Sequence, residues 1–460
     1  MSRPELEKDA PVFRIATLGC KVNQCESDAL ARHLEAGGGI DTQGKGDGHS
    51  DDRVQVCIIN TCTVTHKAAM QSRQAIRQAI RRHPQARIIV TGCYAQTEPD
   101  VIAGIAGVDA VVGHSHKFDL PGLLPSQVAK DSAAPGRLWS PVRETIEFAH
   151  LPVSAFGNRT RPFLRIQDGC DAFCTYCIVP HARGPSRSMP AAMVAEQLTA
   201  LGAEGFREVV LTGIHVGAYG LDLSPATTFA ELLKAVSVAG GVDQLRLSSI
   251  EPAEMKDDIV AIVAASQSQP KGRICPHFHI PLQSGDDEIL ARMHRPYTGS
   301  LFDEVVATIA DRLPEAAIGA DTLIGFPGES EAAFENTYRR IERLPITYLH
   351  VFPFSARKGT PAFHFKDRVP DAVVKARCQR MRTLGERKKR AFYESLLGRR
   401  VAVLVEGGTS DRSGEVKGMT GNYVPVHFQC KGKPPQANTF VQVEAVAVTK
   451  DLRVIGAPID

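Results

Sequence analysis

Three cysteines in one short stretch offer a donor set for a metal centre. Cys170, Cys174 and Cys177 follow a Cys-x3-Cys-x2-Cys spacing, directly after residues 161–167, which predict a short strand. Three thiolates are too few for a closed tetrahedral zinc site. A cubic four-iron, four-sulfur cluster held by these thiolates would keep one iron open. An amino acid could chelate that iron through its amino and carboxylate groups.

Two other interpretations of this stretch stay open at this point. His181, which follows the third cysteine closely, could complete a zinc knuckle. Alternatively, the three thiols could pack as small apolar groups without any metal. The spacing favours the cluster over both alternatives.

A second group of cysteines lies at the ends of predicted strands. Residues 11–124 alternate short apolar runs with stretches of helical period, which indicates a parallel α/β domain. Three predicted strands each lead into a cysteine: residues 12–18 before Cys20, residues 54–60 before Cys62, and residues 87–91 before Cys93. Because parallel strands end at the same edge of a sheet, we expect these thiols to converge as a second three-ligand site. Cys25, one helical turn later, and Cys57, inside a strand, are weaker candidates.

The composition predicts a soluble protein of more than one domain. With 460 residues, 43% of them hydrophobic and 23% charged, the chain exceeds what one hydrophobic core usually holds, so we expect two or three domains. The sequence has no apolar run long enough to span a membrane and its N-terminus is polar, so we expect a cytoplasmic protein without a membrane partner. In that reducing compartment, 11 cysteines indicate metal or redox chemistry rather than disulfides. A net charge of +3 leaves any nucleic-acid affinity to local basic patches.

Beyond a predicted linker at residues 125–158, the pattern indicates two further domains. Strands and helices alternate through residues 159–395, with six predicted strands at residues 163–166, 208–212, 244–250, 277–282, 317–325 and 347–354. This order indicates a partial (β/α)6 barrel of the TIM type, with its chemistry at the carboxyl ends of the strands. Residues 396–460 contain short strand-like runs with Gly-rich turns, at residues 401–406, 413–417, 423–428 and 439–448. Such a pattern predicts a small β-barrel.

The cysteine stretch, followed by Ile-Val-Pro and then Arg-Gly-Pro-Ser-Arg-Ser, resembles the cluster loop of the radical S-adenosylmethionine enzymes. The resemblance implies that the open iron binds the methionine part of S-adenosylmethionine. It also implies that an electron from the cluster cleaves this cofactor to a 5′-deoxyadenosyl radical. Cofactor-binding residues are expected in the cysteine loop and at the ends of later strands: Phe173, Tyr176, Thr212, Gly213, Ser248, Glu251 and Gln283.

The motifs around Cys20, Cys62 and Cys93 indicate a more specific family resemblance. Residues 17–24 read TLGCKVNQ, residues 60–65 read NTCTVT, and residues 91–96 read TGCYAQ. Together with the cysteine loop, they are similar to the tRNA methylthiotransferase family, and most similar to its threonylcarbamoyladenosine-modifying subfamily. The family implies a second [4Fe-4S] cluster on Cys20, Cys62 and Cys93, and two molecules of S-adenosylmethionine per reaction. One methylates a sulfur on the second cluster and the other generates the radical, so that a methylthio group reaches carbon 2 of adenosine 37 in the tRNA anticodon loop.

Local basic patches provide the predicted RNA contacts. Residues 371–400 contain ten Lys or Arg against three Asp or Glu, and their densest point includes Arg387, Lys388 and Lys389. A helix that is basic nearly all round fits a nucleic-acid backbone, although a solvated linker helix is the alternative. Residues 418–426 resemble the TRAM domain, an RNA-gripping barrel, so Lys417 and Tyr423 are further candidates.

Alternatives to a threonylcarbamoyladenosine methylthiotransferase stay open. The same chemistry could act on isopentenyladenosine 37 of tRNA or on an aspartate of a ribosomal protein. A protein of another class, a non-catalytic RNA-binding protein, would use the cysteines to hold structural metal. The enzyme interpretation also implies an electron donor such as flavodoxin or ferredoxin.

Overall fold

The computed structural model describes residues 11–42, 54–120, 135–145, 147–149, 159–407, 414–430 and 433–459. Its internal contacts divide the chain into two compact units. The first unit comprises Met1–Gly157, Asp168–Arg187 and Ser355–Thr360, and the second comprises Asn158–Gln167, Ser188–Phe354 and Pro361–Asp460. The Cys170–Cys177 loop therefore belongs to the same unit as Cys20, Cys62 and Cys93. The predicted domains, which place residues 159–395 together, follow a different division and remain predictions.

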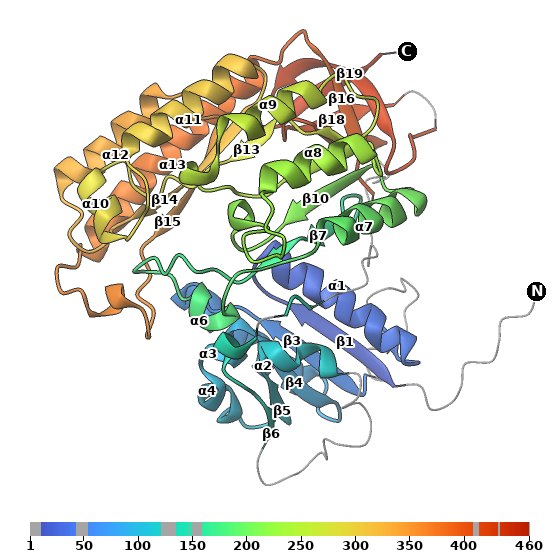
Figure 1. Cartoon of the computed structure of the whole chain (residues 1–460), viewed down its shortest axis with the longest axis vertical. Coiled ribbons are helices and arrows are strands. Elements are labelled where there is room, and N and C mark those ends of the chain that lie inside the picture. Colours follow the sequence, from blue (N-terminus) through green and yellow to red (C-terminus); the bar gives the residue numbers. More distant parts are fainter. Residues whose placement is uncertain are drawn as a thin grey trace, which may run out of the picture. The chain divides into compact units, whose positions relative to one another are not determined.

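The first unit is built on a parallel sheet of six strands, in the order β2-β1-β3-β4-β5-β6 (Figure 1). Its strands are β1 (Val12–Thr17), β2 (Ile40–Asp41), β3 (Val56–Thr61), β4 (Arg87–Gly92), β5 (Ala110–Val112) and β6 (Gly136–Leu138). Its helical elements are α1 (Lys21–Ala36), α2 (His66–Arg82), α3 (Cys93–Thr97), α4 (Pro99–Ala103), η2 (His114–Asp119), η3 (Val142–Glu144) and α6 (Val179–Arg183). All neighbouring strands of this sheet run parallel. The predicted parallel α/β architecture is thus confirmed.

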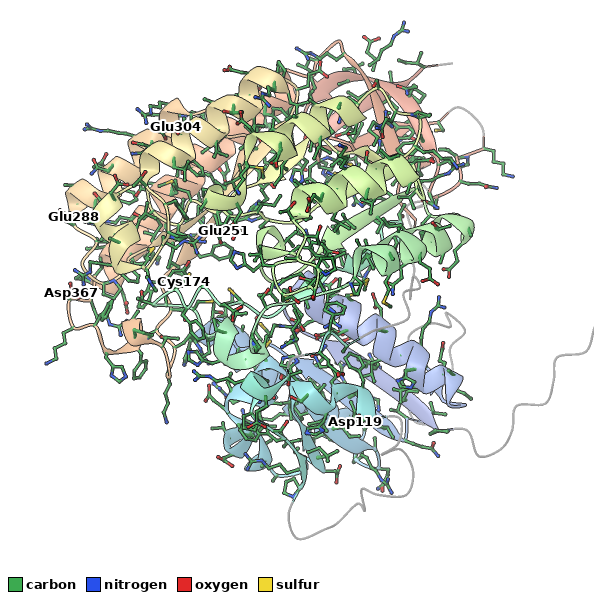
Figure 2. All side chains as sticks on the ribbon, in the orientation of Figure 1. Asp119, Cys174, Glu251, Glu288, Glu304 and Asp367 are labelled. Carbon is green, nitrogen blue, oxygen red and sulfur yellow. The ribbon has the colours of Figure 1, made fainter. Side chains whose placement is uncertain are left out.

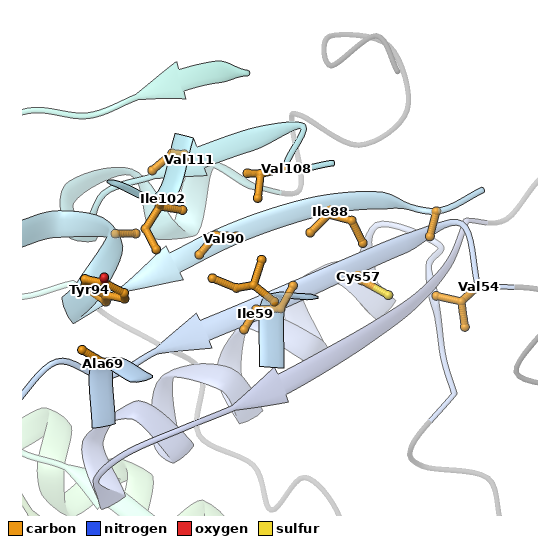
Figure 3. Packing of buried hydrophobic residues seen from close by; sticks show 13 residues of the cluster. Val54, Cys57, Ile59, Ala69, Ile88, Val90, Tyr94, Ile102, Val108 and Val111 are labelled. Carbon is orange, nitrogen blue, oxygen red and sulfur yellow. The ribbon is translucent and has the colours of Figure 1, made fainter. Parts of the chain in front are cut away.

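Both faces of this sheet are buried. In β3, Ile58 packs into a cluster with Phe13 and Leu30, whereas Cys57 and Ile59 belong to the cluster on the opposite face. Figure 3 shows that second cluster, with Cys57 among its aliphatic neighbours. Because side chains alternate along a strand, a strand covered on both faces reads as a continuous apolar run. Such packing holds the strand ends, and hence the residues that follow them, at one edge.

Part of the predicted linker extends the sheet. β6 pairs in parallel with β5, and Trp139 directly after it donates from its indole Nε1 to the backbone carbonyl of Gln96 at 2.9 Å. The far segment Ser355–Thr360 is also tied to this unit, since the Arg357 guanidinium donates to Glu98 at 3.0 Å. A third contact is the backbone N–H of His66, which donates to Ser355 Oγ at 2.9 Å.

The second unit contains two parallel sheets and a barrel (Figure 1). The strands of the four-stranded sheet are β12 (Arg273–Ile274), β11 (Gln244–Leu247), β10 (Glu208–Thr212) and β7 (Phe163–Arg165), and those of the three-stranded sheet are β13 (His277–His279), β14 (Ala317–Ile324) and β15 (Tyr348–Pro353). The unit's helical elements are α7 (Ala191–Ala203), η4 (Val216–Ala218), α8 (Phe229–Ala239), η5 (Pro252–Glu254), α9 (Asp257–Ser266), α10 (Asp287–Arg292), α11 (Gly299–Arg312), α12 (Glu331–Arg343), η6 (Pro361–His364) and α13 (Asp371–Glu394). All six predicted strands of the central region are present, and β12 is an addition to them. The two-residue strands β8 (Gln167–Asp168) and β9 (Arg187–Ser188) pair with each other where the chain passes between the units.

The predicted C-terminal β-barrel is confirmed as a closed barrel in the order β16-β17-β18-β20-β19. Its strands are β16 (Arg400–Val405), β17 (Glu415–Thr420), β18 (Pro425–Gln429), β19 (Phe440–Val448) and β20 (Val454–Pro458), of which β20 was not predicted. Arg246 of β11 anchors the barrel within the second unit, because its guanidinium donates to the carbonyls of Thr420 and Gly421 at 3.1 and 2.9 Å. Glu208 accepts from the same guanidinium at 2.7 Å. No helix in the described segments has the length and apolar character needed to cross a bilayer.

Candidate active site

Three adjacent parallel strands bring Cys20, Cys62 and Cys93 to one sheet edge. β1, β3 and β4 are neighbours in the sheet, and each ends just before one of these cysteines. Gly19 turns with a φ of +102°, and a Cβ built on it would lie 3.0 Å from Cys62 Sγ. Only glycine therefore lets the first loop approach the second cysteine this closely. The structure thus brings together three cysteines that are far apart in sequence, as the strand pattern predicts.

The environment of these thiols differs along the edge. Cys20 is exposed, whereas Cys62 and Cys93 are buried. Burial raises the pKa of the Cys93 thiol to about 12 and also raises the pKa of Cys62, while the positive charge of Arg183 opposes both shifts. The charges of Cys62 and Cys20 raise the pKa of Cys93 further, as expected for thiols that share a site. Three such sulfurs are soft donors that suit iron–sulfur chemistry once a cationic centre deprotonates them.

Asn23 ties the first two strand ends together. The side chain is fully buried, and its Nδ2 donates to the carbonyls of Leu18 and Thr61 at 2.7 and 3.1 Å. Asn60 Nδ2 in turn donates to the backbone carbonyl of Asn23 at 2.9 Å. These amides satisfy backbone groups at the strand ends and so help to hold the cysteine edge in place.

The second triad comes from one loop. Cys170, Cys174 and Cys177 lie between β8 and α6, with Cys174 buried and the other two half-buried (Figure 2 labels Cys174). The Cys177 N–H donates to the Cys174 carbonyl at 2.9 Å, and the Cys170 N–H donates to the carbonyl of Gly184 at 3.1 Å. Phe173 at the loop tip adopts a left-handed φ of +44° and is 43% exposed. A bulky residue in that conformation is held by its surroundings at some cost, which is common at functional sites.

Neither cysteine triad has all three of its sulfur atoms within 4.8 Å of one another. Within the described part of the chain, only one group of three His, Cys, Asp or Glu side chains has all its ligand atoms within 4.8 Å of one another, and it contains none of these cysteines. Thiolates at about 2.3 Å from one zinc ion would lie within about 4 Å of one another. His181, the alternative fourth zinc ligand, instead contacts the Phe173 ring edge-to-face at 5.8 Å. At least one pair of sulfurs in each triad therefore lies too far apart here to share one zinc ion.

Arg183 joins the two triads within the first unit. Its guanidinium donates to Glu26 at 2.9 Å, to Asp168 at 2.8 Å and to Asn23 Oδ1 at 2.6 Å. Glu26 lies in α1 just beyond Cys20, and Asp168 lies just before Cys170. The side chain of Arg183 is 1% exposed, and that of Glu26 is 2% exposed. One buried cation therefore connects the segment after the first strand-end cysteine to both flanks of the cysteine loop.

Two further cations complete this buried network. Lys117 Nζ donates to Glu26 at 2.5 Å, and Arg187 pairs with Asp168 at 3.3 Å. Burial opposes the charge of Arg183, but Glu26 and Asp168 outweigh that effect and raise its pKa well above the ordinary value. Burial lowers the pKa of Lys117, and its pairing with Glu26 counteracts only part of that shift. Nothing in the sequence marks these residues, because a buried charge and its distant partner leave no periodic signal.

The predicted cofactor contacts are divided between the units. Phe173 and Tyr176 belong to the cysteine loop of the first unit, and Tyr176 is half-buried. In the second unit, Ser248 Oγ donates to Thr212 Oγ1 at 3.1 Å. Glu251 forms an ion pair with Arg295. These residues remain predicted cofactor contacts.

Two backbone features accompany the predicted contacts of the second unit. Gly213 follows β10, and a Cβ built on it would lie 2.9 Å from Gln167 Oε1, so glycine permits the close approach. The same Oε1 accepts from the N–H groups of Ile214 and His215 at 3.0 and 2.8 Å, which fixes the loop after the strand. Gln283 has a left-handed φ of +62°. Such a conformation is unusual for glutamine.

The basic helix is less uniformly basic than the sequence suggests. α13 buries Met381, Leu384 and other residues along one face, and several of its arginines pair with acidic residues of or near α12. Among the predicted RNA contacts, Arg387 pairs with Glu342 at 2.6 Å and Lys388 Nζ donates to the Leu344 carbonyl at 2.7 Å. The expectation of a helix that is basic nearly all round is therefore wrong, because tertiary packing covers one face.

The other predicted RNA contacts lie in different surroundings. Lys389 Nζ lies 5.4 Å from the centroid of the Tyr393 ring. Lys417 is exposed on β17. Tyr423 is 39% exposed and stacks on His277 with ring centroids 4.5 Å apart. All remain predicted RNA contacts, and Tyr423 has one ring face already occupied.

Two family models match separate parts of the sequence. Residues 12–113 match the model of "Uncharacterized protein family UPF0004", and residues 164–341 match the "Radical SAM superfamily". Among solved structures, the radical S-adenosylmethionine methyltransferase TsrM from Kitasatospora setae, with cobalamin and a [4Fe-4S] cluster bound, matches with a TM-score of 0.55. That match covers 77% of each chain at 15% identity, so it shows a shared fold.

Curated relatives cover nearly the whole chain. It is 38% identical over 415 residues to "Threonylcarbamoyladenosine tRNA methylthiotransferase MtaB" of Rickettsia prowazekii, covering 90% of each protein. It is 37% identical over 431 residues to the Bacillus subtilis protein of the same name, covering 93% of this chain and 92% of the relative. It is also 32% identical over 425 residues to "tRNA-2-methylthio-N(6)-dimethylallyladenosine synthase" of Clostridium botulinum, covering 90% of each protein. At this identity and coverage, the chain belongs to the radical S-adenosylmethionine tRNA methylthiotransferase family, in the MtaB subfamily.

Proposed function

We propose that this protein is a tRNA methylthiotransferase that converts N6-threonylcarbamoyladenosine 37 to its 2-methylthio form. The observation that carries the proposal is the pair of cysteine triads in one compact unit, joined by the buried Arg183. Carbon 2 of a purine bears an unactivated C–H bond, which no side-chain acid or base can exchange for sulfur at neutral pH. A cofactor must therefore supply the difficult chemistry while the protein supplies position.

The residues present fit two [4Fe-4S] clusters and S-adenosylmethionine. Cys170, Cys174 and Cys177 would hold one cluster, and Cys20, Cys62 and Cys93 would hold the other. When bound, the first cluster supplies the electron that cleaves S-adenosylmethionine, and the second carries the sulfur to be methylated and transferred. Both donor sets offer three soft thiolates and leave one iron for an exogenous ligand.

The chain's own residues act by positioning and by excluding water. Asn23 and Asn60 fix the strand ends that carry Cys20 and Cys62. Arg183 fixes the cysteine loop relative to α1, which limits the geometry over which the two sites can exchange a group. Burial of Cys62 and Cys93 keeps solvent away from reactive sulfur.

Recognition of tRNA would use the second unit. The relatives named MtaB are threonylcarbamoyladenosine tRNA methylthiotransferases. A closed C-terminal barrel with Lys417 on its surface, and the exposed part of α13 with Lys389, support RNA binding. Adenosine 37 lies in a single-stranded loop, where a base can be turned out and read. A tRNA substrate and reducing chemistry both imply a cytoplasmic protein supplied by an electron donor such as flavodoxin or ferredoxin.

Nucleoside analysis tests this proposal. tRNA from cells that lack the protein should retain threonylcarbamoyladenosine, and the purified, anaerobically reconstituted protein should add a methylthio group to that base. Liquid chromatography with mass spectrometry separates this product from methylthio-isopentenyladenosine, the product suggested by the Clostridium relative's name. An unchanged content of the threonylcarbamoyl product in the deletion strain would overturn the substrate assignment. Binding of tRNA without cleavage of S-adenosylmethionine would instead support the non-catalytic alternative.

A further inference from the structure

Three side chains of the second unit converge on one face of its three-stranded sheet. His279 ends β13, Asp321 lies in β14 and His350 lies in β15. Asp321 is the direct partner of His350 in the strand register, and His279 is the partner of Gly319, which shares a face with Asp321. The proposed function leaves these three residues without a role.

The polar atoms of this group meet at Asp321. Its Oδ1 lies 2.8 Å from His279 Nε2 and 3.2 Å from His350 Nδ1. Among the described residues, this is the group of three possible ligands whose ligand atoms all lie within 4.8 Å of one another. The side chains of His279, Asp321 and His350 are 9%, 21% and 53% exposed, so the group is closed at His279 and open at His350.

The hydroxyl of Tyr348 orients His279, the most buried residue of the three. Tyr348 lies with its hydroxyl 3.0 Å from His279 Nδ1 and 2.7 Å from His277 Nε2. Gly319 makes room for this ring, because a Cβ there would overlap the Tyr348 side chain. A histidine that binds a metal usually makes a hydrogen bond through its other ring nitrogen, which sets its tautomer and orientation. Tyr348 holds His279 in that manner, with Nε2 directed at Asp321.

Asp321 carries the negative charge that such a site requires. Burial alone would raise the pKa of this carboxyl group. Hydrogen bonds from His279 and His350, together with their charge, hold the pKa well below its ordinary value. Asp321 is therefore a carboxylate at neutral pH.

We propose that His279, Asp321 and His350 bind one divalent transition-metal ion of the Zn²⁺ or Fe²⁺ class. Two imidazole nitrogens and one carboxylate oxygen are a donor set typical of these ions. Neighbouring ligands at about 2.0–2.2 Å from one ion lie about 2.8–3.6 Å apart, depending on whether the geometry is octahedral or tetrahedral. The observed separations of His279 Nε2 and His350 Nδ1 from Asp321 Oδ1, 2.8 and 3.2 Å, fall within that range. Three protein ligands leave coordination positions on the open, His350 side for water or an anionic oxygen ligand. The site shares no ligand with the two cysteine triads. Zinc binding here can therefore be tested separately from the proposed methylthiotransferase activity.

Zinc binding by the full-length protein tests the site. The protein is first reconstituted with its clusters so that the six cluster cysteines are occupied. It is then dialysed against micromolar Zn²⁺, and bound metal is measured by mass spectrometry. We expect one Zn²⁺ per chain, and at least a tenfold lower affinity in His350→Ala and in Asp321→Asn. His350 is the most exposed member, so its loss should leave the fold intact. His116→Ala, which breaks the exposed pair of His116 with Asp119, is the matched control and should bind Zn²⁺ like the wild type.

X-ray absorption at the zinc edge identifies the ligands. We expect only nitrogen and oxygen neighbours at about 2.0–2.2 Å. A sulfur shell at about 2.3 Å would place the ion on cysteines and overturn the proposal. Equal zinc binding by the wild type, His350→Ala and Asp321→Asn would also overturn it, as would a wild-type protein that binds no Zn²⁺. Far-ultraviolet circular dichroism and iron content confirm that each variant is folded.

Discussion

The cysteine loop and the strand-end cysteines offer the same three donors from different kinds of structure. Cys170, Cys174 and Cys177 lie close together in the chain, and their loop is held by backbone hydrogen bonds within the loop and to Gly184, a few residues after it. Cys20, Cys62 and Cys93 depend on the register of three strands packed on both faces. A local site can tolerate change elsewhere in the molecule, whereas a site made from strand ends requires the whole sheet. Arg183 is therefore the residue through which the locally formed cysteine loop is coupled to the sheet that carries the strand-end triad.

Removing one cysteine ligand from each triad should abolish a different step of the reaction in each case. Cys174→Ala should abolish cleavage of S-adenosylmethionine, because the loop then offers two thiolates to its cluster. Cys62→Ala should retain that cleavage and lose transfer of the methylthio group. Anaerobic assays of 5′-deoxyadenosine and of the modified nucleoside measure both steps. If Cys62→Ala still formed the methylthio product, the strand-end triad would not be the second cluster site.

Thiol reactivity should show whether the strand-end site is formed before metal binds. In the metal-free protein at pH 8, Cys170 and Cys177 should react with iodoacetamide at least about a hundredfold faster than Cys93. Cys93 is buried and burial raises its pKa to about 12, so its reactive thiolate is scarce below that pH. Its reaction rate should rise as the pH approaches that value. Peptide mass spectrometry gives the rate at each cysteine.

Exposed Cys20 provides the internal control for this experiment, because it belongs to the same triad but is open to solvent. It should react at a rate close to that of Cys170. Equal rates at Cys93 and Cys20 would mean that the edge opens without metal, and the contrast between the two triads would then disappear.

The Arg183 link should carry a large part of the first unit's stability. Arg183→Met leaves Glu26 and Asp168 buried without their shared partner, which should cost about 3–5 kcal/mol of unfolding free energy. Denaturant unfolding measures the loss, and iron analysis shows which triad loses its cluster. We expect cleavage of S-adenosylmethionine to survive better than methylthio transfer in the variant, because the loop keeps its local hydrogen bonds.

Arg137→Met is the matched control in the same unit. Arg137 pairs with Asp100 at 2.8 Å, but both side chains are exposed, at 44% and 85%. Such a surface pair contributes about 1 kcal/mol or less. A loss of similar size in the two variants would show that Arg183 is an ordinary ion pair and does not couple the triads.

The contrast also explains which features the sequence could predict. Strand periods and the Gly-Cys or Thr-Cys pairs after them were enough to place Cys20, Cys62 and Cys93 on one edge. The buried Arg183–Glu26 pair was not foreseen, because it joins residues 157 positions apart and neither residue differs locally from a surface charge. The sequence predicts α13 as basic nearly all round, because the acidic partners of its arginines and the elements that cover its buried face lie elsewhere in the chain. β20 was missed because its short Val-Ile-Gly-Ala-Pro run carries little strand signal before the barrel closes.

Substitution of Phe173 at the tip of the cysteine loop should change stability least, which tests whether the loop is a locally formed site. Phe173 has a left-handed φ and is 43% exposed, so Phe173→Gly removes backbone strain while adding freedom to the unfolded chain. These effects oppose each other, and we expect the unfolding free energy to change by no more than about 1 kcal/mol. Phe173→Leu, which keeps the strain and loses the edge contact with His181, should be slightly less stable than Phe173→Gly. Both variants should keep the iron of the loop cluster, because the cysteines are held by their own backbone contacts. Loss of that iron in Phe173→Gly would mean that cluster binding by the loop depends on the Phe173 side chain. The loop would then need contacts beyond its backbone, just as the strand-end triad needs its sheet.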